Sequence, residues 1–142
     1  MSPFLVTILP VLAGPLLTLV PEATSWKSGQ EVRARIEGKP TEPAFLPACG
    51  ALQLEVFEAD ENRWVPEEGD PCMRTQAAVP LADVFKNQPT MGLKVNVERF
   101  TVARLILVYG VDCQPGLPLE LAVCKRFEAA VSPNLSIFAV KD

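Results

Sequence analysis

The sequence contains no histidine. Histidine is the usual general base near neutral pH, so its absence excludes Ser-His-Asp and Cys-His nucleophile systems. The same absence excludes zinc and copper sites that use histidine ligands. Ser-Lys chemistry and carboxylate pairs are the catalytic arrangements that remain. An enzyme is therefore the class of protein we expect least, and we expect no cofactor.

The chain also lacks an excess of positive charge. Its 13 Lys and Arg residues stand against 17 Asp and Glu residues, which gives a formal net charge of −4. A protein that binds nucleic acid needs a basic surface to neutralise phosphates, so we expect no nucleic-acid partner. We find no internal repeat and no low-complexity tract. A length of 142 residues fits one domain.

No charge occurs before Glu22, yet the apolar N-terminal segment is not expected to span a membrane. Pro10 and Pro15 would break a helix there. Two interpretations remain for residues 1–13. They have the length and the small-residue ending of a cleaved signal peptide, or they form an N-terminal strand of the fold. Residues 14–142 are expected to form one β-domain.

Apolar and polar residues alternate in several short segments, which is typical of half-buried strands. The segments are "EVRARIEG", "ALQLEVFEA" and "LKVNVERF". A nearly continuous apolar run, "VARLILVYGV", predicts a central strand, and "LELAVC" and "LSIFAV" predict two more. Fourteen prolines favour short elements joined by turns. We therefore predict an all-β fold, a single antiparallel sandwich of about seven to nine strands.

The order of these segments resembles secreted immunoglobulin-like β-sandwich modules. The residues that carry the resemblance are "LTL…SGQEVRARI…C…LEVFEADENRWVP…C…ARLILVY…SIFAV". Cys49, Trp64 and Cys113 have a tolerable Cys…Trp…Cys spacing for such a module. Tyr109 departs from the pattern, because it precedes Cys113 by four residues where a tyrosine corner needs two. So general a fold implies no specific function.

Four cysteines, Cys49, Cys72, Cys113 and Cys124, permit three disulfide connectivities. None of them lies in a C-x-x-C pair, so neither a zinc ribbon nor a thioredoxin-like motif is indicated. We favour the local pairs Cys49–Cys72 and Cys113–Cys124, because each would close a hairpin. The alternatives are the antibody-like pair Cys49–Cys113 with Cys72–Cys124, the pairs Cys49–Cys124 and Cys72–Cys113, and four reduced, buried thiols.

Seven carboxylates lie between Cys49 and Cys72. They are Glu55, Glu58, Asp60, Glu61, Glu67, Glu68 and Asp70. The glycine-centred spacing of a tight calcium loop is absent, so we expect an exposed, metal-free hairpin turn around Asp60–Asn62. Trp26 and Trp64 are expected to pack against neighbouring strands.

Two proline-rich connections are the candidate binding loops. "GKPTEPAFLPAC" carries Phe45 and Leu46, and "CQPGLPLELAVC" carries Leu117 and Leu119. Proline and a disulfide stiffen such loops and reduce the entropy lost on binding. The alternative is that these four residues close the ends of the core.

We therefore expect a secreted or surface-associated, non-enzymatic binding or structural module with a protein or glycan partner. The alternatives are a secreted protease inhibitor that presents the loop between Cys113 and Cys124, and an assembly subunit of a filament or coat. A donated strand, "FLVTIL", would indicate the subunit. The sequon at Asn134 predicts N-glycosylation in a eukaryotic secretory pathway.

Overall fold

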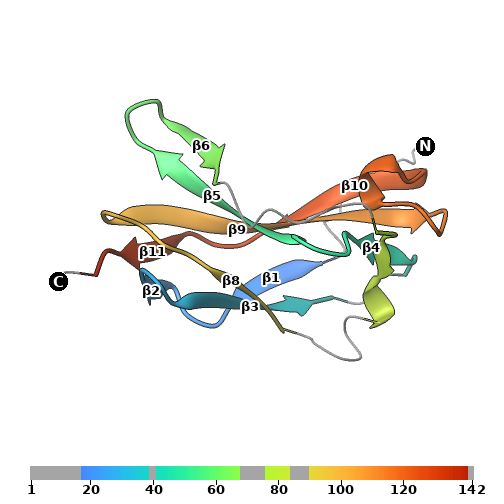
Figure 1. Cartoon of the computed structure of the whole chain (residues 1–142), viewed down its shortest axis with the longest axis horizontal. Helices are drawn as coiled ribbons and strands as arrows, with labels where there is room; N and C mark the ends of the chain where they lie inside the picture. The colour runs from blue at the N-terminus through green and yellow to red at the C-terminus, as the bar shows by residue number, and fades with distance from the viewer. Residues whose placement is uncertain (1–16, 39–40, 68–75, 84–89, 141–142) are drawn as a thin grey trace, which may run out of the picture.

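The computed structural model describes residues 17–38, 41–67, 76–83 and 90–140 of the chain. Within them, two β-sheets pack face to face (Figure 1). The strands are β1 (Thr18–Pro21), β2 (Ser25–Lys27), β3 (Glu31–Glu37), β4 (Ala44–Leu46), β5 (Leu52–Glu58), β6 (Arg63–Pro66), β7 (Val79–Pro80), β8 (Thr90–Lys94), β9 (Thr101–Cys113), β10 (Cys124–Val131) and β11 (Leu135–Phe138). The predicted all-β sandwich is confirmed, although it is not wholly antiparallel as expected, because β2 and β11 pair in parallel. The strand number exceeds the expected seven to nine because β2, β4 and β7 are too short to show an alternating pattern.

The smaller sheet contains β1, β3 and β8 in that order. Strand β3 alternates as predicted: Val32, Ala34 and Ile36 are buried, and Arg33 and Arg35 are exposed. The two arginines lie close to neighbouring glutamates on the outer face. Exposed ion pairs of this kind add little stability. They do make the outer face of the smaller sheet charged.

Strand β9 is the centre of the larger sheet and is 13 residues long. It pairs with β5 and β4 along one edge and with β10 and β11 along the other. The predicted central strand is confirmed. Its alternate residues from Ala103 to Val111 are buried, so one face of β9 packs against the smaller sheet.

Ser132 lets β10 and β11 follow one another along the same edge of β9. The Ser132 N–H donates to the carbonyl of Leu105 at 2.9 Å, and the Leu105 N–H donates to Ser132 Oγ at 2.8 Å. The hydroxyl thus accepts a hydrogen bond that a strand carbonyl would otherwise accept. Because Ser132 is buried, a residue without this hydroxyl would leave the Leu105 N–H unsatisfied.

Tyr109 is the largest fully buried side chain and joins the two sheets near their rim. Its hydroxyl donates to Glu128 Oε1 on β10 at 2.9 Å and accepts from the Leu17 N–H, next to β1, at 3.3 Å. Burial of a phenol requires such partners. Tyr109 therefore stabilises the sandwich although its position does not match a tyrosine corner.

Strands β5 and β6 form the predicted hairpin, which projects from the larger sheet (Figure 1). Phe57 lies opposite Trp64 across the hairpin, with ring centroids 5.3 Å apart. The Arg104 guanidinium lies 4.2 Å from the centroid of the Trp64 ring and pairs with Glu55 at 2.7 Å. The expected packing of Trp64 across the strand pair is confirmed. Trp26, also as expected, packs against the core.

The predicted strand "LELAVC" is wrong. Leu119–Leu121 form a 3-10 helix, and β10 begins only at Cys124. The Leu121 N–H donates to the Pro118 carbonyl at 2.9 Å, which closes a tight turn. This turn places Leu119 in the core, where it is 5% exposed. Burial of Leu119 outweighs the weak alternation that suggested a strand.

The predicted strand "LKVNVERF" is only partly correct, because β8 ends at Lys94. Val95 exchanges backbone hydrogen bonds with the Gly29–Gln30 turn, and the Val97 N–H donates to Ser28 Oγ at 2.7 Å. These residues pair with a turn and not with a strand.

In the described part of the chain, no helix is long and apolar enough to cross a membrane. Residues 1–13, for which we predict either a signal peptide or an N-terminal strand, lie outside the described residues.

Candidate functional site

Exposed apolar side chains gather at two places on the described surface. Of eight large hydrophobic residues that are exposed, five lie between Leu117 and Val131. They belong to the loop between Cys113 and Cys124, hereafter the disulfide loop, and to β10. The other three are Phe100, Phe138 and Val140.

The disulfide loop is closed by a bond between Cys113 and Cys124, which lie directly opposite each other on β9 and β10. This confirms the predicted local pair and shows that the antibody-like pair Cys49–Cys113 is wrong. The two ends of the loop are further joined by a hydrogen bond from the Gln114 N–H to the Val123 carbonyl at 2.9 Å.

Cys49 is also disulfide-bonded, so the alternative of four reduced thiols is wrong. Its predicted partner, Cys72, lies outside the described residues.

Leu119 anchors the disulfide loop on the larger sheet beside Gly110. A Cβ atom on Gly110 would lie 2.5 Å from Cys113 Sγ, 2.7 Å from Cys124 Sγ and 3.0 Å from Leu119 Cδ1. The glycine therefore leaves the space that the disulfide and the anchoring leucine fill. The loop is also tied to the segment before β7, since the Ala78 N–H donates to the Leu117 carbonyl at 2.9 Å.

The apolar residues that this anchored loop leaves in solvent are Leu121, Val123 and Leu117. Their side chains are 69%, 61% and 41% exposed, respectively. A loop fixed by a disulfide, a buried leucine and backbone hydrogen bonds loses little further conformational entropy when it binds. The arrangement is therefore suited to recognition through aliphatic contacts.

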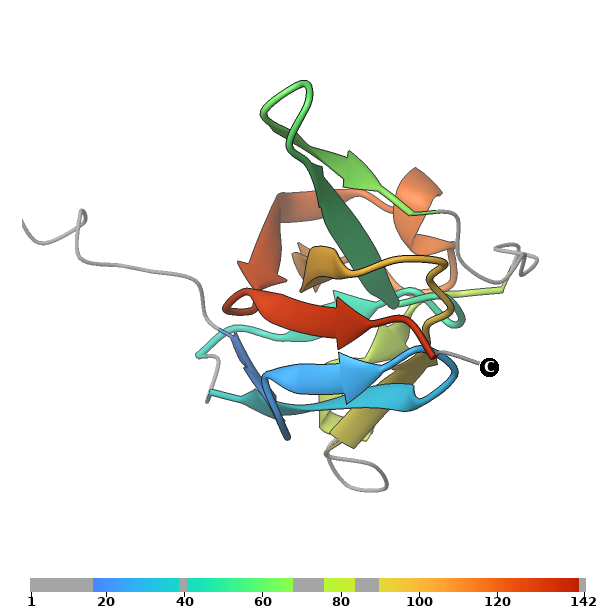
Figure 2. The same cartoon turned by 90° about the vertical axis from the view of Figure 1, so that its left-hand side faces the viewer.

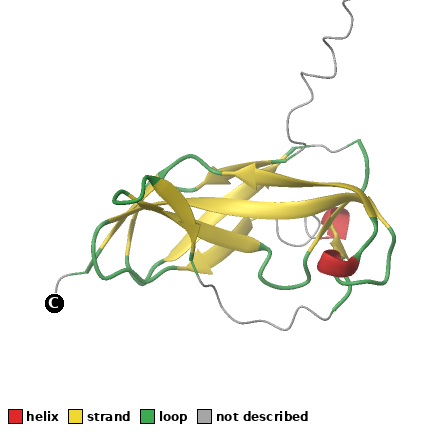
Figure 3. Cartoon of the chain, turned by 90° about the horizontal axis from the view of Figure 1, so that it is seen from above, coloured by secondary structure: helices red, strands yellow, loops and turns green. Residues whose placement is uncertain are grey.

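The structure brings the two predicted binding loops together at one end of the sandwich. Phe45 pairs with Gly110 on β9, the same residue against which Leu119 packs. Figure 3 shows helical turns (red) at this end, opposite the C-terminus. Leu46 and Leu119 are buried, Phe45 is half-buried and Leu117 is exposed. In this structure a partner can reach Leu117 and part of Phe45.

Sequence reasoning missed Leu121, Val123 and the exposed row on β10. Phe127, Ala129 and Val131 form this row, hereafter the β10 row, and all three point away from the core. The alternation in "RFEAAV" could have identified the β10 row.

A network of charged groups lies where β10 meets the segment before β4. Glu42 accepts hydrogen bonds from Lys125 Nζ at 2.8 Å and Arg126 Nη1 at 3.1 Å. Arg126 also pairs with Glu128 on the same strand. The hydrogen bonds from Lys125 and then Arg126 lower the pKa of Glu42, and the hydrogen bond to Glu128 is the main cause that raises the pKa of Arg126.

These contacts predict a pH dependence of stability. A carboxyl whose pKa is lower in the folded state stabilises the fold above its unfolded pKa, about 4.5 for Glu42. That contribution is lost as the pH falls from about 4.5 through the folded pKa. We expect Glu42→Gln to remove this part of the acid destabilisation, so that the free energy of unfolding falls less steeply with decreasing pH below 4.5. Urea unfolding of the wild-type protein and the variant between pH 3 and pH 7 measures this pH dependence. Equal slopes for the two proteins would contradict the assignment.

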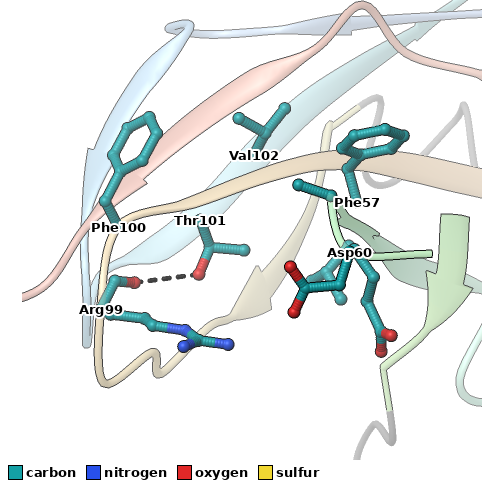
Figure 4. Close-up of a pocket in the computed structure, with 9 residues that line it drawn as sticks. Phe57, Asp60, Arg99, Phe100, Thr101 and Val102 are labelled. Atoms are coloured by element: carbon teal, nitrogen blue, oxygen red, sulfur yellow. Dashed lines mark hydrogen bonds between the residues drawn. The ribbon is translucent and has the colours of Figure 1, made fainter. Parts of the chain in front are cut away.

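A second candidate site is an open cleft of about 580 Å³ at the other end of the molecule. It lies between the tip of the β5–β6 hairpin and the loop before β9, and Figure 4 shows Phe57 and Phe100 on its two sides. Asp60 and Arg99 face each other across the opening. Phe100 contacts Phe138 on β11, with ring centroids 5.1 Å apart. The cleft offers aromatic surface and charge. Its two charged residues labelled in Figure 4, Asp60 and Arg99, are exposed, and the half-buried Thr101 donates its hydroxyl to the Arg99 carbonyl at 2.9 Å.

The carboxylates of the β5–β6 hairpin do not converge on one point. Glu55 pairs with Arg104 and Glu61 with Arg63, and the Asp60–Asn62 turn is exposed as expected. Among the described residues, no three His, Cys, Asp or Glu side chains are grouped as metal ligands would be. Glu68 and Asp70 lie outside the described residues.

The fold and this site define a small disulfide-containing β-sandwich that presents an apolar loop at one end. Comparison with known proteins finds no family model, no curated protein and no solved structure that matches the chain.

Proposed function

We propose that the protein is a secreted or surface-associated, non-enzymatic binding module that recognises a protein through the disulfide loop. The observation that carries the proposal is the exposure of Leu117 and Leu121 on a loop held by a disulfide and by buried Leu119. Large apolar side chains held rigidly in solvent commonly mark interaction sites. Aliphatic side chains suit a protein partner better than a glycan, which is usually bound through aromatic faces and polar groups.

The extracellular part of the proposal rests on cysteine chemistry. Cys113 and Cys124 are bonded to each other, and Cys49 is bonded as well. Disulfides persist mainly in oxidising compartments. Asn134, in the exposed turn between β10 and β11, is accessible for the glycosylation that its sequon predicts.

A protease inhibitor is a second candidate, because the same loop is braced at both ends. A substrate-like inhibitor presents an extended segment to the protease, whereas Leu119–Leu121 form a 3-10 turn. Because of this difference, we prefer general protein recognition to protease inhibition. The segment "FLVTIL", on which the assembly-subunit alternative depends, lies outside the described residues.

The test compares two surface variants in a capture experiment. Wild-type protein is first used to capture extracellular proteins from the native source, and the affinity for each captured protein is then measured. We expect Leu117→Ser with Leu121→Ser to weaken that binding at least tenfold. Both side chains are exposed, so the free energy of unfolding should change by less than about 0.5 kcal/mol each.

The matched control is Val140→Ser, which removes an equally exposed aliphatic side chain, 59% accessible, at the other end of the molecule. It should leave binding unchanged. Unchanged binding by the loop variant, or equal loss in the Val140 variant, would contradict the proposal. Inhibition of a serine protease panel by wild-type protein, with loss in the loop variant, would favour the inhibitor.

A further inference from the structure

Strand β10 has an unpaired edge among the described residues. It pairs with β9 on one side, and no described strand pairs with its other side. Figure 1 shows β10 beside β9, and Figure 2 shows the molecule from the end at which the C-terminus lies. An unpaired edge presents N–H and C=O groups that can accept another strand.

The backbone groups that point outward can be identified from the register. The Ser132 N–H donates to the Leu105 carbonyl, so alternate residues before it, Ala130 and Glu128, also direct their backbone groups toward β9. The intervening residues are those of the β10 row, Phe127, Ala129 and Val131. Their N–H and C=O groups therefore point away from β9, and their side chains lie exposed on the outer face.

The β10 row lacks the features that usually protect an edge. Strands β1, β6 and β7 each contain a proline, which cannot donate to an added strand. The β10 row has no proline and carries two large apolar residues, Phe127 at 52% and Val131 at 46% exposure. The exposed Lys125 precedes the row, and its ammonium group pairs with Glu42. An apolar, unprotected edge is a site for strand addition.

We propose that β10 binds β10 of a second copy of this chain, antiparallel, with the two-fold axis at Ala129. Phe127 then lies opposite Val131 of the second copy, and Val131 opposite its Phe127. Ala129 lies opposite Ala129 of the second copy. Each of these three pairs exchanges two backbone hydrogen bonds. All exposed apolar side chains of the row thus face apolar partners.

Charge and backbone geometry disfavour the neighbouring registers. An axis at Arg126 or Glu128 would place like charges opposite each other, which is destabilising. An axis at Phe127 would place Val131 opposite Val123 of the second copy. The Val123 carbonyl already accepts from the Gln114 N–H, so Val123 does not direct that group toward the free edge.

The dimer is independent of the proposed function, because it uses the β10 row and leaves Leu117 and Leu121 of the disulfide loop unpaired. A protein that dimerises but captures no partner would refute the proposed function alone. A monomer that binds a partner through the loop would refute the dimer alone.

Sedimentation velocity of the purified wild-type protein over a range of concentrations measures the association. We expect a reversible dimer with a dissociation constant in the micromolar range. Ala129→Pro removes an N–H that faces solvent in the monomer, so it should weaken the dimer at least tenfold with little effect on the melting temperature. The control is Phe100→Glu, at the other end of the molecule, where Phe100 is as exposed as Phe127 (53% and 52%). It should leave the dimer intact.

A complementation experiment tests the register. We expect Phe127→Glu and Val131→Lys each to weaken self-association, because each places two charges opposite apolar residues. Mixed together, they should associate at least tenfold more tightly than either alone, since one Glu–Lys pair and one Val–Phe pair replace the mismatches. Both positions are exposed, so both variants should fold.

Three results would overturn the proposal. One is a purified wild-type chain that stays monomeric at millimolar concentration. That result would mean that another segment of the chain covers the edge or that the edge serves another protein. Another is a dimer that survives Ala129→Pro. The third is a mixture of the two charged variants that associates no better than its components.

Discussion

Replacing Gly110 with alanine is expected to lower the free energy of unfolding of the oxidised protein by about 3 kcal/mol. The new Cβ would lie 2.5 Å from Cys113 Sγ and 2.7 Å from Cys124 Sγ. These sulfur atoms are fixed by their bond and by two paired strands, so they cannot move without distorting β9 and β10. Urea unfolding under oxidising conditions gives the loss directly.

Gly92→Ala is the matched control for this prediction. A Cβ at Gly92 would also make close contacts, but the nearest atoms belong to the exposed side chain of Glu31, which can rotate away. We expect a change below about 1 kcal/mol. Equal losses for the two glycines would show that the disulfide is not the cause.

Removing the Cys113–Cys124 disulfide with a double alanine substitution is expected to cost about 3 kcal/mol. The two cysteines are 11 residues apart, so the bond removes the conformational freedom of a short loop from the unfolded chain. We also expect faster hydrogen exchange at the Gln114 amide, which bonds across the base of the loop. A loss below about 1 kcal/mol would contradict the prediction.

The two predictions are coupled, which makes them more specific. Without the sulfur atoms, a Cβ on Gly110 would meet only Leu119 Cδ1 at 3.0 Å among the contacts described above. The Gly110→Ala penalty should therefore fall to below about 1 kcal/mol in the double alanine background. A double-mutant cycle measures this interaction, and additive effects would refute it.

Sequence periodicity predicted the strands that bury one face and expose the other. In "EVRARIE" and "LQLEVFE" every second residue had to be apolar to reach the core, so β3 and β5 could be located from the pattern alone. The Cys113–Cys124 pair was predicted because it would close a hairpin. The hairpin exists, but its second strand begins at Cys124, whereas the predicted strand ended there. Strands β2, β4 and β7 were missed, since two or three residues cannot establish a period.

The candidate site was predictable only in part. The proline-bounded disulfide loop was identified, but which of its leucines face solvent depends on the 3-10 turn that buries Leu119 and exposes Leu121. That turn depends on the space that Gly110 leaves for Leu119. Leu119 thus contacts β9 from the disulfide loop, and a local sequence pattern does not reveal such a contact. The free edge of β10 likewise follows from the strand order, which periodicity does not determine.

The central position of β9 also constrains the order in which the chain can fold. Strands β4 and β5 precede β9 by roughly fifty residues, so the larger sheet cannot form until residues 101–113 have left the ribosome or the translocation channel. The β9–β10 hairpin, in contrast, closes a short loop and can form early. Oxidation of Cys113 and Cys124 at that stage would fix the hairpin before the distant strands arrive. The last third of the chain thus acts as the template on which the first two thirds assemble. A chain that is truncated before Thr101 keeps only the two-residue β7 beside β4 and has no strand for the β9 edge of β5.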